Sequence, residues 1–342
     1  MAKVSTRQIM AYGFIAAMIL SAFFYLFQQF KSDPQQGHNT TKPARPPVNQ
    51  VAVPVFSADS AYVFVEKQVK FGPRVPNTEA HRKCAAWMVA EFKRFGLSVI
   101  EQKFQARHFK GTTFNANNII AQYKPEIPRR ILIGAHWDSR FAADKDSTNP
   151  DKPIDGADDG ASGVGVLLEL ARTLSKNPLD IGVDFLCIDV EDQGDDNGEP
   201  ETWCLGSQYW AKNLHRPNYM PYQAVLLDMV GGKNARFYKE GISMEVAPRT
   251  VDKIWEIAIA QGFMQYFIPE NRPGITDDHL FIIKGARIPM IDIISTPNEG
   301  SHPFPDWHHK HADSMENIDR GTLKAVGQTM TVFIYQTYNL EG

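Results

Sequence analysis

Side chains able to hold a metal ion occur together in one short stretch of the chain. His136 and Asp138 directly follow an apolar run, and Asp159 lies further on, in the segment GADDGASG. Imidazole nitrogens and carboxylate oxygens together suit a divalent ion such as zinc. The stretch therefore predicts a metal site, with one plainer alternative: a histidine at a strand end, followed by an acidic loop that caps a helix.

Acidic residues also close two later apolar runs. Residues 183–190 end in Glu191-Asp192, and residues 224–227 end in Asp228. If these runs are parallel strands, their carboxyl ends meet at one edge of the sheet, which is where ligands bind in open α/β folds. Like charges converge there only when a cation or shared protons neutralise them. Together with Asp138 after the first run, three strands of this chain are predicted to end in acidic residues, which favours a common site.

Strands that alternate with helices predict the fold that positions these residues. Buried strands are predicted at residues 131–135, 183–190, 224–227 and 288–294. Helical patterns cover residues 57–70, 77–95, 164–174, 206–214, 250–261 and 319–338. Residues 99–109 and 117–123 alternate as an antiparallel edge pair does. This order predicts a three-layer α/β/α fold with a mixed, mainly parallel central sheet.

The amino-terminal segment has the pattern of a membrane anchor. Lys3 and Arg7 precede an apolar run over residues 9–27, which as a helix would reach roughly 28 Å, about one bilayer core. We expect residues 1–30 to be an uncleaved signal anchor whose basic end stays in the cytoplasm. A cleaved secretory signal is the alternative. In both cases the rest of the chain would lie outside the cytoplasm, most simply in a bacterial periplasm.

The remainder divides into a linker and one domain. Residues 31–52 are polar and rich in proline, which predicts a flexible linker, and residues 53–342 then form one catalytic domain. The formal net charge of −3 over 342 residues gives no basic excess that would indicate a nucleic-acid partner. As a separate expectation, the protein is a monomer. Three cysteines cannot all pair within the chain; a Cys187–Cys204 disulfide is possible in an oxidising compartment, and the sequence does not decide it.

These motifs resemble those of the M28-type zinc aminopeptidases. The segment GADDGASG, the His-x-Asp before it, the Glu191-Asp192 pair, and His309 with Asp313 four residues on occur in that family's order. The likeness extends from about Val53 to the C-terminus. It implies a zinc aminopeptidase-like fold and a zinc-dependent enzyme.

Within this group the chain is most similar to the glutaminyl cyclases. Residues 275–279 read Ile-Thr-Asp-Asp-His, where related aminopeptidases usually have Ser-Asp-His. Residues 304–309 read Phe-Pro-Asp-Trp-His-His, close to the cyclase pattern. Two positions depart from the family: Asp192 replaces a glutamate, and His308 stands where a tryptophan usually precedes the metal histidine, with Trp307 one place earlier.

The resemblance implies a role for each residue of the site. The ligands of one zinc ion would be Asp159, Asp192 and His309. Glu191 would be the general acid/base, and Asp228 with Asp277 would form a catalytic pair of carboxylates that share a proton. The residues expected to line the substrate pocket are Trp203, Ile275, Thr276, Phe304 and Trp307. His136 and Asp138 would orient the ligands.

The implied reaction converts the N-terminal glutamine of peptides or proteins to pyroglutamate with release of ammonia. The main alternative is an aminopeptidase with two zinc ions, in which His136 and Asp228 hold the second ion. A third alternative, from a different class, is an inactive ectodomain that only binds peptides. Asp277 in place of serine favours the cyclase.

Overall fold

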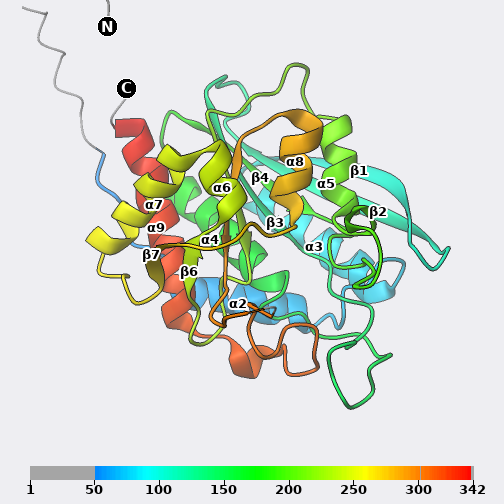
Figure 1. Ribbon diagram of the computed structural model, residues 1–342. Helices are drawn as coiled ribbons and strands as arrows, with labels where there is room; N and C mark the ends of the chain where they lie inside the picture. Colours follow the sequence, from blue (N-terminus) through cyan, green and yellow to red (C-terminus); the bar gives the residue numbers. More distant parts are fainter. Residues whose placement is uncertain (1–50, 301, 340–342) are drawn as a thin grey trace, which may run out of the picture. The chain divides into compact units, whose positions relative to one another are not determined.

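The computed structural model describes residues 51–300 and 302–339, whose central sheet has six strands in the order β1-β2-β4-β3-β5-β8 (Figure 1). The strands are β1 (Ser98–Arg107), β2 (Thr113–Tyr123), β3 (Arg130–His136), β4 (Gly182–Ile188), β5 (Gln223–Asp228) and β8 (Met290–Ile294). β1, β2 and β4 are antiparallel neighbours, and β4, β3, β5 and β8 run parallel. The prediction of a mixed, mainly parallel sheet is confirmed.

Helices cover both faces of this sheet (Figure 1). One face carries α2 (Ala58–Val69), α3 (Glu79–Arg94), α4 (Ala161–Lys176), α7 (Pro248–Ala260) and α9 (Arg320–Asn339). The other face carries α5 (Leu205–Lys212) and α8 (Asp278–Ala286). Phe185 packs in the first core and its neighbour Leu186 in the second, because successive side chains of a strand point to opposite faces. The predicted three-layer α/β/α architecture is therefore confirmed.

The two central strands explain why the site forms where it does. Every residue of β3 and β4 is buried, as expected for strands covered on both faces. β3 lies between β4 and β5, with which it is parallel, so the carboxyl ends of all three strands meet at one edge. The acidic residues that follow these strands are thereby brought together from distant parts of the chain.

Four short elements were not indicated by the sequence. β6 (Phe237–Lys239) and β7 (Phe267–Asn271) form a separate two-stranded parallel sheet, and α6 (Gly241–Val246) packs against β8. α8 begins at the Asp-Asp-His motif, where Asp277 is the N-cap residue. β6, β7 and α6 have too few residues to show a recognisable periodicity. α8 contains a continuous apolar run, residues 280–283, which does not show the spacing of an amphipathic helix.

The structure answers the expectation about the cysteines, and the membrane anchor stays a prediction. Cys84, Cys187 and Cys204 are all free and buried, so the Cys187–Cys204 disulfide does not form. In the described part of the chain, no helix is long and apolar enough to cross a membrane. The anchor expected at residues 1–30 and most of the linker expected at residues 31–52 lie outside the described residues.

Candidate active site

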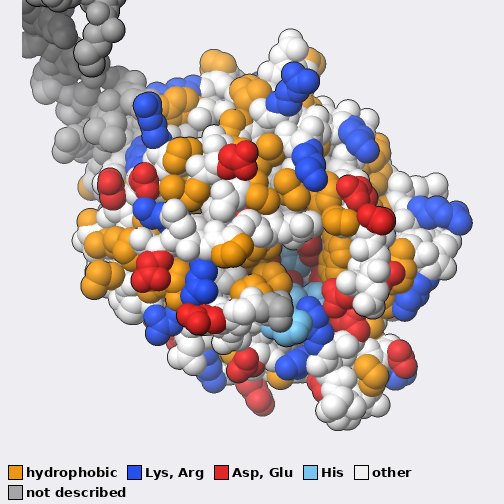
Figure 2. All heavy atoms as spheres, in the orientation of Figure 1, with side chains coloured by type: hydrophobic (Ala, Val, Ile, Leu, Met, Phe, Trp, Pro, Cys, Tyr) orange, Lys and Arg blue, Asp and Glu red, His pale blue; other side chains and the backbone are white. Residues whose placement is uncertain are grey.

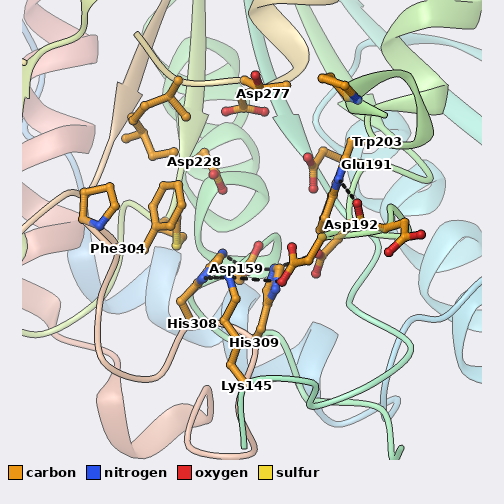
Figure 3. Close-up of a pocket in the computed structure, with 18 of the residues that line it drawn as sticks. Lys145, Asp159, Glu191, Asp192, Trp203, Asp228, Asp277, Phe304, His308 and His309 are labelled. Carbon is orange, nitrogen blue, oxygen red and sulfur yellow. Dashed lines mark hydrogen bonds and ion pairs between the residues drawn. The ribbon is translucent and has the colours of Figure 1, made fainter. Parts of the chain in front are cut away.

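A cavity of about 430 Å³ opens at the shared carboxyl edge of β3, β4 and β5. Figure 2 shows a hollow in this face of the molecule, in which histidine and acidic side chains are visible. Ten of its lining residues were predicted from the sequence: Asp159, Glu191, Asp192, Trp203, Asp228, Ile275, Thr276, Asp277, Phe304 and His309. The structure therefore brings nearly the whole predicted set into one cavity (Figure 3).

Asp159, Asp192 and His309 form its most buried group. His309 Nε2 lies 3.0 Å from Asp192 Oδ1 and 3.8 Å from Asp159 Oδ2. Neither oxygen of Asp192 has a hydrogen-bond partner within the described residues, and neither does Asp159 Oδ2. Buried carboxylates left without partners are costly, and a bound cation would remove that cost. One imidazole nitrogen and two carboxylates are donors of the kind that zinc prefers. Asp159 and His309 also belong, with His308, to a group whose ligand atoms all lie within 4.8 Å of one another.

The loop before α4 fixes the position of Asp159. The Asp313 carboxylate accepts the backbone N–H groups of Asp158 (2.8 Å) and Asp159 (3.1 Å). Gly160 follows with φ of 94°, and a Cβ there would lie 2.5 Å from the carbonyl oxygen of Asp138, so only glycine fits. Gly160 is also the N-cap residue of α4, and no side chain caps this helix. Asp159 is therefore not a helix cap, which removes the plainer interpretation of the motif.

Asp138 holds the second acidic pair in place. Its carboxylate accepts the backbone N–H groups of Glu191 (3.1 Å) and Asp192 (3.2 Å) and the side-chain amide of Gln193 (2.9 Å). Val190, at the start of this turn, has φ of 57°, which is unfavourable for a β-branched residue. The Asp138 bonds stabilise this strained turn and so direct both acidic side chains toward the cavity.

The His136 imidazole lies between carboxylates that come from different parts of the site. Its Nε2 lies 3.0 Å from Asp159 Oδ1 and 3.2 Å from Asp228 Oδ1, and its Nδ1 lies 3.5 Å from Asp138 Oδ1. Burial acts to lower the pKa of His136, but the contacts with these three carboxylates outweigh it and raise the pKa well above its usual range. His136, Asp159 and Asp228 offer ligand atoms within 4.8 Å of one another, as Asp159, His308 and His309 do, so they are another group of metal-binding geometry.

The remaining carboxylates are held in conditions that favour shared protons. Burial raises the pKa of Asp228 to about 7, and the nearby Asp277 carboxylate adds to the rise. Burial likewise raises the pKa of Asp277, and it raises that of Glu191 well above its usual range. A pKa near neutrality suits Asp228 to hold or transfer a proton at the pH of a cell.

Aromatic rings form part of the cavity wall. Trp203 stacks on His309 with ring centroids 5.8 Å apart and an angle of 11° between the planes. The ring packs over Gly194, where a Cβ would lie 2.1 Å from it, so this glycine makes room for the indole. Phe304 packs on His308 with centroids 4.5 Å apart. The cavity is therefore lined by aromatic rings as well as by carboxylates.

The placement of Trp307 differs from the prediction. Its indole N–H donates to Asp158 Oδ2 (3.2 Å), and its ring fills the space beside Gly232, where a Cβ would lie 2.5 Å from it. Trp307 is not among the residues that line the cavity, and His308 lines it instead. The indole N–H finds its hydrogen-bond partner away from the cavity, which turns the ring out of the wall.

Sequence reasoning missed several lining residues. Lys145 comes from the irregular segment after β3, and its Nζ lies 3.3 Å from His308 Nδ1 and 3.7 Å from Asp196 Oδ2. Asp195 and Asp196 line the mouth of the cavity. An acidic, glycine-containing loop directly after a metal-ligand pair was the available signal for the two aspartates, whereas Lys145 had none.

Comparison with known proteins agrees with this geometry. The chain has a three-layer fold with an acidic and histidine-bearing site at the strand ends, and the model of peptidase family M28 matches residues 118–334. The chain belongs to peptidase family M28. Its relatives of known structure include glutaminyl cyclases, and the family and its relatives favour zinc as the metal.

Three solved structures illustrate the likeness. The glutaminyl cyclase of Tannerella forsythia is 49% identical, with a TM-score of 0.80 over 82% of this chain and 99% of that one. The Bacteroides thetaiotaomicron glutaminyl cyclase bound to N-acetylhistamine is 47% identical, with a TM-score of 0.80 over 83% and 99%. A Zn-dependent exopeptidase from Parabacteroides distasonis is 48% identical, with a TM-score of 0.81 over the same shares. Glutaminyl cyclases recur among the relatives and the solved structures, which favours that activity over the aminopeptidase.

Proposed function

We propose that the protein is a zinc-dependent glutaminyl-peptide cyclotransferase. It converts the N-terminal glutamine of peptides or proteins to pyroglutamate and releases ammonia. One observation carries this choice: Asp277, the residue that distinguishes the motif from Ser-Asp-His, is 4% exposed and lines the cavity together with Asp228. Its Oδ1 accepts the backbone N–H of Asp278, and its Oδ2 is a buried oxygen without a hydrogen-bond partner within the described residues.

The reaction needs a base, an acid and a folded substrate, but no water. The α-amine nitrogen forms a bond to the side-chain amide carbon, and the bond from that carbon to the amide nitrogen breaks. Glu191 accepts the proton from the amine and returns it to the departing nitrogen, which leaves as ammonia. Bound zinc supplies an electrophile for the carbonyl oxygen.

Asp228 and Asp277 hold the amide that is cleaved. With the pKa of Asp228 at about 7 and that of Asp277 also raised, the pair can keep one proton between them. The carboxylate oxygens then accept hydrogen bonds from the amide nitrogen, while the shared proton limits their repulsion. Trp203, Phe304 and His308 enclose the glutamine side chain, which favours the folded conformer from which the amine attacks.

We further propose one zinc ion per chain, bound by Asp159, Asp192 and His309. His136 would then be an imidazolium that donates to Asp159 and Asp228, in keeping with its raised pKa. The M28 aminopeptidase with two zinc ions is the second candidate, because His136, Asp159 and Asp228 also have metal-binding geometry. Two ions would recruit Asp228 as a ligand and remove it from the pair with Asp277.

The full-length protein, assayed with Gln-peptides and with leucine and alanine amides, separates these candidates. Ammonia release from Gln-peptides without cleavage of the amides supports the cyclotransferase. Cleavage of the amides without cyclisation supports the aminopeptidase. Zinc content per chain, measured by mass spectrometry of the metal, is expected to be one for the first and two for the second. Neither activity in zinc-loaded protein would indicate a domain that only binds peptides.

A further inference from the structure

The buried thiol of Cys204 lies directly against the Glu191 carboxylate. Its Sγ donates to Glu191 Oε1 at 3.2 Å, and the side chain is fully buried. Among the described residues, this is the one hydrogen bond that the Glu191 carboxylate accepts. The other oxygen, Oε2, accepts no hydrogen bond within the described residues and lies 3.8 Å from His136 Nδ1. One oxygen of the proposed base is therefore fixed and the other is left available.

The backbone around Cys204 directs the thiol. The Cys204 N–H donates to the carbonyl oxygen of Glu191 (3.0 Å), and the Leu205 N–H donates to that of Val190 (2.9 Å). These two bonds hold the start of α5 against the strained turn after β4. Cys204 itself has φ of 55° and ψ of 37°, a left-handed conformation that is unfavourable for residues other than glycine. Such strain is retained where surrounding contacts enforce it, often at functional sites.

A second carboxylate, that of Asp277, lies near the same thiol. Cys204, Glu191 and Asp277 offer ligand atoms within 4.8 Å of one another. Asp277 is 4% exposed, and its Oδ2 has no hydrogen-bond partner within the described residues. Burial and the neighbouring Glu191 carboxylate raise the pKa of the Cys204 thiol well above its usual range. The sulfur therefore keeps its proton and is a donor between the two carboxylates of the proposed reaction.

We propose that Cys204 is a positioning residue for the general base. Its S–H group holds Glu191 Oε1 and leaves Oε2 for the proton of the substrate amine. A thiol is a weak donor, so it orients the carboxylate while withdrawing less of its basicity than a hydroxyl does. This inference rests on the proposed role of Glu191 as the base, and it adds no covalent step to the reaction.

Two substitutions in the full-length protein test the role. Cys204→Ala removes the donor, and Cys204→Ser keeps a donor in the same place. We expect kcat to fall about tenfold in C204A, the effect of one hydrogen bond, with KM and zinc content unchanged. C204S should recover kcat to within about threefold of the wild type. Cys187→Ala is the matched control, because Cys187 is an equally buried thiol in the interior of β4, and its kcat should not change.

Several results would overturn the inference. A C204A variant with wild-type kcat would show that the bond does not matter, and C204S as slow as C204A would show that the thiol only fills space. Loss of zinc or of folding in both variants would assign Cys204 a structural role. If the wild type hydrolyses amino-acid amides instead of cyclising glutamine, the proposed function fails. The ratio of kcat between each variant and the wild type can then be measured for amide hydrolysis, in which Glu191 would activate water. If the wild type has neither activity, crystal structures decide: a Glu191 carboxylate that stays in place in C204A contradicts the inference.

Discussion

The imidazole ring of His308 is stacked on that of His309, with centroids 3.7 Å apart and an angle of 25° between the planes. These neighbours in the chain nevertheless face different partners. His309 Nε2 is directed at Asp192, whereas His308 Nδ1 lies 3.3 Å from Lys145 Nζ, and the His308 ring packs on Phe304. His309 has φ of 56°, and this left-handed turn of the backbone helps two consecutive side chains to enter one cavity.

Substitution of the two histidines should therefore have separate effects. His309→Ala removes the single nitrogen of the proposed ligand set, so we expect zinc content to fall close to zero and activity to be lost with it. His308→Phe keeps a flat ring against Phe304 and leaves the ligands in place, so zinc content should be unchanged, with an altered KM for Gln-peptides. Metal analysis of both purified variants checks this. His308 also lies 3.8 Å from Asp159, so a loss of zinc in H308F would make it a ligand as well.

Replacement of the general base should separate turnover from metal binding. Glu191→Gln keeps the shape of the side chain but cannot accept the amine proton. We expect kcat to fall by about 10² to 10⁴, the usual contribution of a general acid/base, with one zinc ion retained. Glu199→Gln is the control, because Glu199 is exposed on the loop after Asp192 and should have wild-type kinetics. Equal loss of zinc and activity in E191Q would contradict the assignment and make Glu191 structural.

The two tryptophans should differ because only one lines the cavity. Trp203→Ala removes a wall and the stacking partner of His309, so we expect a raised KM and a lowered kcat for Gln-peptides. Trp307→Phe removes the donor to the buried Asp158 carboxylate, so we expect a loss of about 1–3 kcal/mol in the free energy of unfolding, with KM nearly unchanged. Steady-state kinetics and urea denaturation of both variants check this. A larger change of KM in W307F than in W203A would contradict the assignment.

The sequence predicted the scaffold well because its elements are long or fully buried. Apolar runs such as residues 131–135 read as strands without tertiary information, and the acidic residues that end them must then share one sheet edge. The placement of Asp192 and Asp228 in one cavity follows from strand order, whereas Asp159 is also held there by the bonds of its loop with Asp313. Their roles in catalysis stay predictions until the variants are measured.

Local side-chain choices could not be predicted in the same way. The Trp307 side chain does not line the cavity because its indole N–H donates to the Asp158 carboxylate and its ring fills the space beside Gly232. Both residues come from distant parts of the chain. From the sequence, Cys204 was considered only as a possible disulfide partner of Cys187. Its contact with Glu191 depends on a left-handed backbone that no residue pattern in this stretch indicates. Such contacts are decided by tertiary packing, not by spacing.

His215 should make the folded state sensitive to mild acid, at a distance from the proposed metal site. Burial lowers its pKa to about 4, and its Nδ1 already accepts the Trp210 indole N–H (3.3 Å), so the folded state resists protonation there. In the unfolded chain a histidine has its usual pKa of about 6.5. Between these values the unfolded state binds more protons, so stability falls as pH falls from about 6.5 to about 4, by up to about 3 kcal/mol.

His215→Gln removes this titration while keeping a polar side chain that can face Trp210. We expect the free energy of unfolding of the wild type to fall more steeply between pH 7 and pH 4.5 than that of H215Q, as measured by urea denaturation. The comparison cancels the contribution of the carboxylates and histidines of the cavity, because they titrate equally in both proteins. His215→Gln should lower stability at pH 7, where the neutral imidazole packs against Tyr219 with ring centroids 4.4 Å apart. Parallel pH profiles for the two proteins would mean that the folded state protonates His215 as readily as the unfolded chain does.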